Sequence, residues 1–167
     1  MQGHDAERGH AILECCQAQV EDLDQILQLD TQAYNGKSLW PRSIYESELN
    51  STNNEIFVLK FPENGEIVGF ACCSLVLDEC SITNIVVSKN HLRKGFASQL
   101  LSYMLDFGNS KGVRQWYLEV RAETNPAAVA LYKKFGFESV GRRKHYYSNP
   151  REDALILQRG LDLSQIS

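Results

Sequence analysis

Apolar and polar positions follow two different periods along the chain, and these periods separate its helices from its strands. Apolar side chains recur every three or four residues over 20–33 and over 95–109, which predicts two amphipathic helices. Two further helices are expected to begin at Trp40-Pro41 and at Asn125-Pro126, because proline is favoured in the first helical turn. Strands are predicted from short apolar runs or from strict alternation, over 11–16, 55–61, 66–77, 80–87, 114–121, 137–147 and 152–159.

The order of these elements predicts the fold class. Three consecutive strands over 55–87 are joined by short turns, so they form an antiparallel meander. The rest of the chain alternates as β-α-β-α-β. The two parts together predict an α/β (α+β) fold, in which helices cover both faces of a mixed, mostly antiparallel sheet. A length of 167 residues suits one core, so we expect a flexible N-terminus over 1–10, one domain over 11–160 and a tail over 161–167.

Composition and charge exclude several classes of protein. A net charge of −4 argues against nonspecific nucleic-acid binding, which needs a basic face. No run of 18 apolar residues is present and the first residues lack the apolar core of a signal peptide, so we expect a cytoplasmic protein without a membrane partner. The five cysteines are odd in number, no CxxC occurs and the histidines are scattered. We therefore expect buried thiols, not disulfides, a metal site or a covalent acyl-cysteine route.

The junction "LRKGFA" at residues 92–97 places two cations and a glycine between a strand and a helix. A helix N-terminus has unpaired N–H groups and a partial positive charge, so it attracts anions. Gly95 allows close approach to the backbone, and Arg93 and Lys94 add positive charge. The turn could therefore hold a diphosphate, although basic residues beside a glycine are common at helix starts. The spacing matches neither a P-loop nor GxGxxG.

Two polar side chains in the second half of the chain are candidates for chemistry. In strand 114–121, Glu119 shares a face with Tyr117 and Arg121, and a carboxylate is unusual in a strand. The structural alternative is an ion pair with Arg121 or another cation. Tyr132 lies two turns after Asn125, where an aromatic residue on an apolar helix face is by default part of the core. The spacing alone leaves both questions open.

Together these segments resemble the GNAT family of acetyl-CoA-dependent N-acetyltransferases, from about residue 11 to residue 159. The family's coenzyme motif, Q/R-x-x-G-x-G/A, reads "LRKGFA" here, with Leu92 in place of the usual Gln or Arg. The segments "VLDECSITNIVV", "WYLEVRAETNPAAVALYKKFGF" and "RRKHYYSNPREDALIL" resemble the RimI type most closely. That type acetylates the N-terminal alanine of a small-subunit ribosomal protein.

The resemblance implies roles for particular residues. Glu119 is implied as the general base, Tyr132 as the general acid and Tyr146 as a contact to the substrate N-terminus. Acetyl-CoA is implied as co-substrate, with no metal, and Val87 N–H as the group that polarises its thioester carbonyl. The residues implied in coenzyme binding are Ile85, Val86, Val87, Arg93, Lys94, Gly95, Phe96, Ala97, Ser98 and Asn125.

Amine chemistry explains why a protein N-terminus suits such a site. Attack on a thioester requires a neutral amine, and the pKa is about 7.7–8.0 for an α-amine but about 10.4 for a lysine. Direct transfer between two bound substrates then needs no cysteine nucleophile. The alternatives are a GNAT enzyme for a small amine or a lysine side chain and a coenzyme-binding module without catalysis. The sequence also leaves open whether a partner subunit is required.

Overall fold

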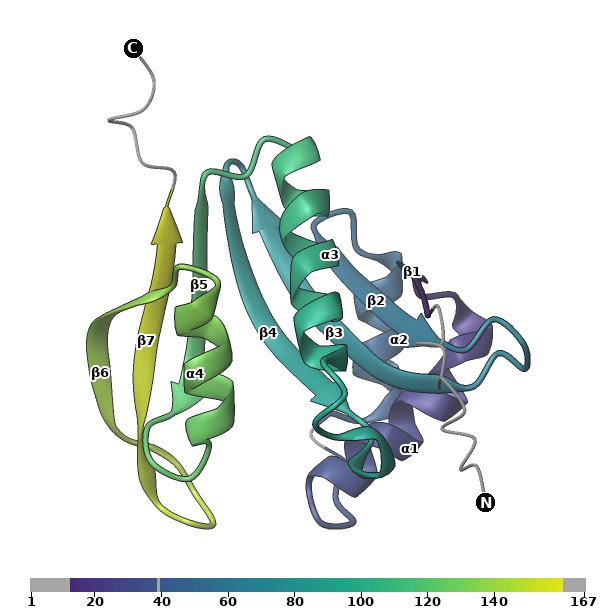
Figure 1. Ribbon diagram of the computed structural model, residues 1–167, viewed down its shortest axis with the longest axis horizontal. Coiled ribbons are helices and arrows are strands. Elements are labelled where there is room, and N and C mark those ends of the chain that lie inside the picture. The colour runs from purple at the N-terminus through teal and green to yellow at the C-terminus, as the bar shows by residue number, and fades with distance from the viewer. Residues whose placement is uncertain (1–12, 39, 161–167) are drawn as a thin grey trace, which may run out of the picture.

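The structure, a computed structural model, describes residues 13–38 and 40–160 (Figure 1). The predicted segments 1–10 and 161–167 lie outside the described residues, as do the first two positions of the predicted strand 11–16. The strands are β1 (Glu14–Gln17), β2 (Asn54–Lys60), β3 (Ile67–Val76), β4 (Glu79–Val87), β5 (Gln115–Arg121), β6 (Glu138–Tyr147) and β7 (Glu152–Gly160). The helices are α1 (Leu23–Ala33), α2 (Arg42–Asn50), α3 (Phe96–Ser110) and α4 (Pro126–Lys134), with short 3₁₀ turns η1 (Val20–Asp22) and η2 (Lys89–His91).

The seven strands form one sheet in the order β1-β2-β3-β4-β5-β7-β6. Strands β1 to β4 pair in antiparallel fashion, which confirms the predicted meander. Among the strands of the described residues, only β4 and β5 run parallel, and α3 connects them. Strand β7 returns between β5 and β6 and is antiparallel to both. The mixed, mostly antiparallel sheet expected from the sequence is therefore confirmed.

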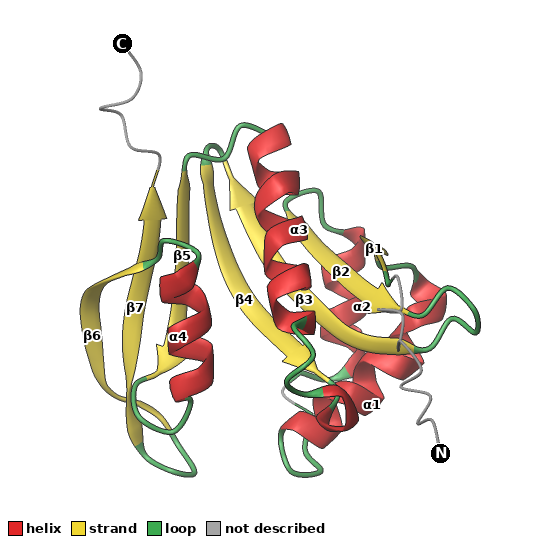
Figure 2. Cartoon of the chain, viewed as in Figure 1, coloured by secondary structure: helices red, strands yellow, loops and turns green. Residues whose placement is uncertain are grey.

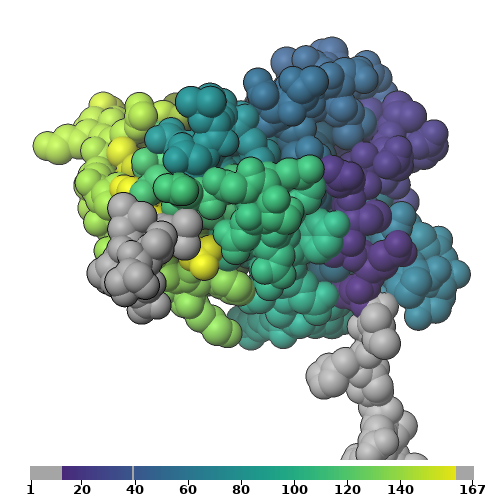
Figure 3. All heavy atoms as spheres, turned by 90° about the horizontal axis from the view of Figure 1, so that it is seen from above, coloured from purple at the N-terminus to yellow at the C-terminus, as the bar shows by residue number. Residues whose placement is uncertain are grey.

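Helices cover both faces of the sheet (Figure 2). On one face α3 and α4 pack over a large apolar cluster that includes residues of β2 to β5 and β7. On the other face α1 and α2 pack over a smaller cluster from β2, β3 and β4. The smaller cluster contains no residue of β5, β6 or β7. Viewed from above, the green atoms of α3 and the blue atoms of the α2 region lie on opposite sides of the molecule (Figure 3).

The apolar stripes that predicted the helices face these clusters. Leu100, Leu101, Met104 and Leu105 of α3 are all buried, as predicted. Within the helix predicted over 20–33, the part from residue 23 is α-helical. Val20 is 56 % exposed, so its place in the predicted apolar face was wrong. It lies in η1, whose three-residue turn rotates side chains away from the α-helical stripe.

Helix α3 approaches β5 closely because position 108 is glycine. A Cβ atom at Gly108 would lie 2.3 Å from the ring of Trp116. The indole is 2 % exposed and fills the space that a side chain on the helix would take. Of the residues described, no helix is both long and apolar enough to cross a membrane.

The two parallel strands separate halfway along their length. Ladder pairing between β4 and β5 ends at Ile82 and Leu118. At the same level β4 contains a bulge, because Ile82 and Asn84 pair with the consecutive residues Cys73 and Cys72 of β3. A bulge bends its strand, so β4 diverges from β5 beyond this point. Helices α3 and α4 both begin at the end of the sheet where the strands have separated (Figure 1).

Candidate active site

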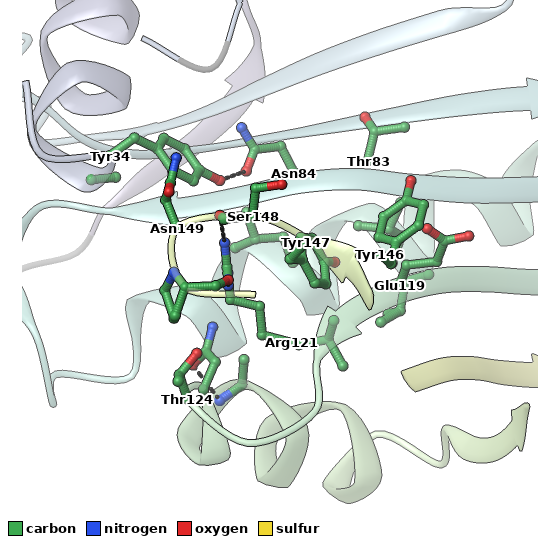
Figure 4. Close-up of a pocket in the computed structure, with 18 of the residues that line it drawn as sticks. Tyr34, Thr83, Asn84, Glu119, Arg121, Thr124, Tyr146, Tyr147, Ser148 and Asn149 are labelled. Carbon is green, nitrogen blue, oxygen red and sulfur yellow. Dashed lines mark hydrogen bonds between the residues drawn. The ribbon is translucent and has the colours of Figure 1, made fainter. Parts of the chain in front are cut away.

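A cavity of about 920 Å³ lies where β4 and β5 separate. Its walls come from both strands, from the start of α4, from the loop after α1 and from the turn between β6 and β7. The side chains that point into this space include Tyr34, Asn84, Glu119 and Tyr147 (Figure 4). Because the ladder is open here, the β5-facing backbone edge of β4 beyond Ile82 is not used by β5 and is available to a ligand.

The β4 wall of the cavity carries Thr83, Asn84 and Ile85. Asn84 is 7 % exposed, and its Oδ1 accepts a hydrogen bond of 3.2 Å from the hydroxyl of Tyr34. Burial, followed by the charge of Asp30, raises the pKa of Tyr34. The hydroxyl therefore remains protonated at neutral pH and joins the loop after α1 to the centre of the sheet.

Glu119 lies on the β5 wall, with 27 % of its side chain exposed. Its Oε1 is 2.9 Å from Nε of Arg143, which reaches over from β6. The sequence left open that Glu119 forms an ion pair with Arg121 or another cation, and Arg143 is that cation. Arg121, the other cation considered, pairs elsewhere. The ion pair leaves room for a chemical role because a carboxylate has about four acceptor positions on two oxygens.

Tyr132 of α4 both packs in the core and lines the cavity. Its ring lies 5.7 Å from the ring of Phe137, and the residue is 8 % exposed. Burial raises its pKa, and the neighbouring Tyr34 and Tyr147 add to this shift. The two readings of Tyr132 are thus compatible, because a ring can be packed while its hydroxyl stays protonated as a hydrogen-bond donor.

The tyrosine pair at the end of β6 faces Glu119. A hydrogen bond with Glu119, together with the charge of that carboxylate, raises the pKa of Tyr146. Burial, and then the charge of Glu119, raises the pKa of Tyr147 to about 12. The two rings meet edge to face at 5.0 Å. Both line the cavity, and Tyr146 is 51 % exposed, so it forms part of the rim.

Arg121 fixes the loops at the wide end of the cavity. Its Nη1 donates to the backbone oxygen of Pro150 and to Oε1 of Glu152, at 2.9 and 2.8 Å, and its Nη2 donates to the oxygen of Ser148. The guanidinium also lies 4.6 Å from the centre of the Tyr147 ring. The arginine thereby holds the β6–β7 turn against β5 and supports the tyrosine beside it.

Glu152 completes this anchor from β7. It accepts hydrogen bonds from the backbone N–H groups of Glu123 and Thr124 and from the Thr124 hydroxyl. Burial by itself would raise the pKa of Glu152, but the bonds from Thr124, Arg121 and the two N–H groups outweigh it and lower the pKa to about 2. One carboxylate therefore orders the loop that leads from β5 into α4.

The turn at residues 92–97 has the backbone of an anion-binding loop. Arg93 and Gly95 have φ angles of +63° and +77°, and α3 begins immediately afterwards without a side-chain cap. A Cβ at Gly95 would meet no protein atom within 4 Å, so the space beside the backbone is open. Lys94 Nζ lies 3.3 Å from Nδ1 of His91. The first N–H groups of α3 thus face outward beside a cationic loop.

Asn125 and Pro126 begin α4 as the sequence predicts. Oδ1 of Asn125 accepts a hydrogen bond of 3.3 Å from the N–H of Ala128, and Pro126 is the first helical residue. Asn125 also lines the cavity. The N-terminus of α4 is therefore next to the opening between β4 and β5.

Comparison with known proteins identifies the family. Residues 20–137 match the model of the acetyltransferase (GNAT) family. The chain belongs to the GNAT family. The [ribosomal protein bS18]-alanine N-acetyltransferase of Haemophilus influenzae is 36 % identical over 139 residues, which cover 81 % of this chain and 90 % of that protein. The same-named enzyme of Escherichia coli K12 is 40 % identical over 97 residues, or 57 % of this chain and 65 % of that protein.

A solved structure agrees with the assignment to the GNAT family. The crystal structure of the ribosomal-protein-S18-alanine N-acetyltransferase from Escherichia coli superposes with a TM-score of 0.80 and 30 % identity. The match covers 89 % of this chain and 94 % of that one. The resemblance to GNAT enzymes inferred from "LRKGFA" and the later segments is confirmed, as is the fold class. The chain is an N-acetyltransferase of this family.

The residues expected from the GNAT resemblance occupy two separate places. Glu119, Tyr132, Tyr146, Asn125 and Ile85 all line the cavity. The segment 93–98 does not line it and lies beyond the carboxyl end of β4, where α3 begins (Figure 1). The side chains of Val86 and Val87 do not line it either. Val86 packs under α1 and α2 and Val87 under α3, so these two positions offer a ligand their backbone.

Sequence reasoning missed several residues of this GNAT site. Tyr34, Asn84, Tyr147 and the anchor formed by Arg121 and Glu152 were not assigned roles. The adjacent tyrosines could have indicated Tyr147, but nothing local indicates that Tyr34 meets Asn84, 50 positions away. All five cysteines are free thiols, and burial raises the pKa of the partly exposed Cys15 to about 12. Within residues 13–38 and 40–160, no group of three or more His, Cys, Asp or Glu could hold a metal ion.

Proposed function

We propose that this GNAT enzyme transfers the acetyl group of acetyl-CoA to the N-terminal α-amine of a protein, in a ternary complex of both substrates. The substrate that best fits is the N-terminal alanine of ribosomal protein bS18, because two similar enzymes are named for that reaction. The observation that carries the proposal is the cavity where β4 and β5 separate, since Glu119 and Tyr132 both line it. A ribosomal substrate also agrees with the cytoplasmic location expected from the sequence.

The residues present fit acetyl-CoA at the open side of β4. The loop from Arg93 to Ser98 offers main-chain N–H groups and a cationic surface to the diphosphate, with open space beside Gly95. The backbone of Ile85, Val86 and Val87 offers an edge to the extended arm of the coenzyme. Asn125 contacts it from the start of α4. When bound, the coenzyme supplies an activated acetyl thioester.

Leu92 is compatible with this arrangement although the family motif has Gln or Arg there. The residue is 56 % exposed, and its backbone is extended ahead of the helix. A cradle built from N–H groups depends on the φ and ψ angles of the loop and not on this side chain. We therefore propose that the substitution weakens coenzyme binding only slightly.

Four groups of the site each have one role in the proposed acyl transfer. Glu119 receives, directly or through water, the proton that the attacking amine loses as the carbon–nitrogen bond forms. Tyr132 donates a hydrogen bond to the sulfur as the carbon–sulfur bond breaks. The N–H of Val87 stabilises the negative charge that develops on the carbonyl oxygen. Tyr146, at the rim and beside Glu119, contacts the substrate N-terminus.

The raised pKa of Tyr132 sharpens its proposed role. A thiolate has a pKa of about 8.5, so complete proton transfer from this tyrosine to the sulfur would be uphill. The hydroxyl therefore stabilises the leaving sulfur chiefly as a hydrogen-bond donor, and the proton that the sulfur finally carries comes from the amine through Glu119 or solvent. In this description Tyr132 is a hydrogen-bond donor to the leaving sulfur, and no free tyrosinate is formed, whereas the family resemblance implied a full general acid.

A panel of acceptors tests the proposed function. The enzyme is incubated with acetyl-CoA and a peptide that begins with alanine, and mass spectrometry identifies the acetylated atom. Matched controls are the same peptide with a blocked N-terminus and an internal lysine, and free spermidine. We expect acetylation of the free N-terminus. Turnover of spermidine or of lysine without turnover of the alanine peptide would contradict the proposal, and tight coenzyme binding without any turnover would favour a non-catalytic module.

A further inference from the structure

Arg143 is a charged residue beside the site, and it has no role in the acyl transfer proposed above. It does not line the cavity, and 57 % of its side chain is exposed. Its Nε nevertheless lies 2.9 Å from Oε1 of Glu119, and its guanidinium is 5.7 Å from the centre of the Tyr146 ring. The arginine thus stands at the rim, against the carboxylate that faces the cavity.

The pair spans β5, β7 and β6 on the face of these strands that lies opposite α4, where the smaller apolar cluster has no residue. Glu119 of β5 is paired with Ile156 of β7, whose partner on β6 is Gly141. A Cβ at Gly141 would come within 3.3 Å of the Ile156 side chain. A glycine at this point leaves the face shallow, so that Arg143 can reach across β7 to the carboxylate.

An exposed ion pair contributes little to folding, so stability alone does not account for a cation in this position. The cation also changes the net charge that an incoming amine meets. Without Arg143, the carboxylate of Glu119 would attract any ammonium group, including lysine side chains and polyamines. With the guanidinium at 2.9 Å, the local charge is balanced, so a second cation loses the net attraction that the bare carboxylate would exert.

A neutral amine is unaffected by this balance. At pH 7 about a tenth of an α-amine is already neutral, against well under a thousandth of a lysine amine. A site with balanced charge therefore favours the α-amine, whereas a site with a net negative charge favours ammonium groups. The selectivity between the two amines then depends on which protonation state the site binds. It requires no contact between the enzyme and the rest of the substrate.

We propose that Arg143 is a specificity-determining residue that excludes cationic amines from Glu119 and so selects the neutral α-amine over lysine and polyamine acceptors. The inference rests on the proposed function, because it takes Glu119 as the group that faces the attacking nitrogen. It goes beyond that function by assigning amine selectivity to a residue outside the cavity wall.

Three variants of the full chain test the proposal. Arg143→Gln removes the charge, Arg143→Lys keeps it, and Arg142→Gln is the matched control. Arg142 is adjacent on β6 and is also paired, with Asp153 at 2.7 Å, but not with Glu119. For each protein, kcat/KM is measured at pH 7 for an alanine-starting peptide without lysine, for an N-terminally blocked peptide with one lysine, and for spermidine. Melting temperatures establish that each variant is folded.

We expect Arg143→Gln to raise the ratio of lysine or spermidine turnover to α-amine turnover by about tenfold. Arg143→Lys and Arg142→Gln should stay within about twofold of the parent, because both retain a cation at position 143. An unchanged ratio in folded Arg143→Gln, with normal α-amine turnover by the parent, overturns this inference alone. Absence of α-amine turnover by the parent overturns the proposed function instead.

Discussion

The two arms of the sheet differ in how much of their surface is covered. The first arm, β1 to β4, has α3 on one face and α1 and α2 on the other, and both faces carry buried apolar clusters. The second arm, β5, β7 and β6, has α4 on one face, and the smaller cluster contains none of its residues. Glu119 and Arg143 lie on this uncovered face of the second arm.

The difference separates two kinds of recognition. In the proposed function, the first arm binds the coenzyme mainly through main-chain atoms of β4 and of the loop before α3. The second arm contributes the side chains of Glu119, Tyr132, Tyr146 and Tyr147, which line the cavity, with Arg121 beside Tyr147. On this proposal, binding through the main chain should tolerate a change such as Leu92, whereas binding through side chains should not. The substitutions below test this contrast, from the largest expected effect to the smallest.

Tyr132→Phe should produce the largest effect. We expect kcat to fall about a hundredfold, because the sulfur loses its hydrogen-bond donor, while KM for acetyl-CoA changes little. Steady-state kinetics on an alanine-starting peptide measures both parameters. Tyr103→Phe is the control, since this tyrosine of α3 packs against Phe57 of β2 and does not line the cavity. Unchanged kcat in folded Tyr132→Phe would remove Tyr132 from the reaction.

Glu119→Gln should lower kcat/KM at pH 7 by about tenfold to a hundredfold, because the amine loses its proton acceptor. The deficit should persist as the pH rises past about 8, because an amine that is already neutral in solution still loses a proton as the carbon–nitrogen bond forms. A pH profile of kcat/KM from 6 to about 9.5 measures the deficit over this range. Glu138→Gln, on the exposed edge strand β6, serves as the control. A deficit that disappears above about pH 8 would argue against proton acceptance by Glu119 during bond formation.

Gly95→Ala tests main-chain recognition on the first arm. Position 95 has φ +77°, which costs a non-glycine residue about 1 kcal/mol and distorts the loop before α3. We expect KM for acetyl-CoA to rise about tenfold with kcat nearly unchanged. Gly65→Ala is matched to it, with φ +71° and equally open space in the β2–β3 turn. An equal change in KM for both variants would contradict a coenzyme loop at Gly95.

Glu152→Gln should lower the melting temperature at neutral pH by several degrees, because Arg121 and the loop before α4 lose their shared acceptor. The pKa of Glu152 is lower in the folded protein, about 2, than the usual 4.5. Its stabilising effect is therefore complete above pH 4.5 and is lost as the pH falls toward 2.

Thermal melts of both proteins between these pH values measure the contribution of Glu152. The parent should lose stability more steeply than Glu152→Gln as the solution is acidified, so the two curves converge. Glu123→Gln, whose side chain is 79 % exposed, should follow the parent. Parallel curves for the parent and Glu152→Gln would show that the anchor does not set acid stability.

Asn125→Ala should have the smallest effect. It removes the bond to the N–H of Ala128 and should cost about 1 kcal/mol of folding free energy. Urea denaturation measures this loss, and KM for acetyl-CoA reports the proposed contact at the same position. Asn125→Ser restores a capping oxygen and should recover the stability. Recovered stability with KM still raised would separate the coenzyme contact from the helix cap.

The positions of helices and strands could be predicted because they depend on local patterns. Two local patterns predict directly which side of an element is buried. They are the alternation along β5 and the apolar stripe of α3, which consists of Leu100, Leu101, Met104 and Leu105. Asn125-Pro126 indicates the start of α4, because the Asn125 side chain accepts a hydrogen bond from the first turn of that helix. The site was only partly predictable, because Glu119 and Tyr132 were recognisable as family positions whereas their neighbours were not.

The amino-acid sequence by itself determined the elements, the mixed sheet, the GNAT membership and the principal polar residues. Only the tertiary structure decided that β7 returns between β5 and β6, that β4 leaves β5 after Ile82, and that Glu119 meets Arg143 and not Arg121. Periodicity and capping act over a few residues and can be read along the chain. Strand order, a bulge and an ion pair across β7 depend on contacts between distant segments, and these form only when the sheet closes around its core.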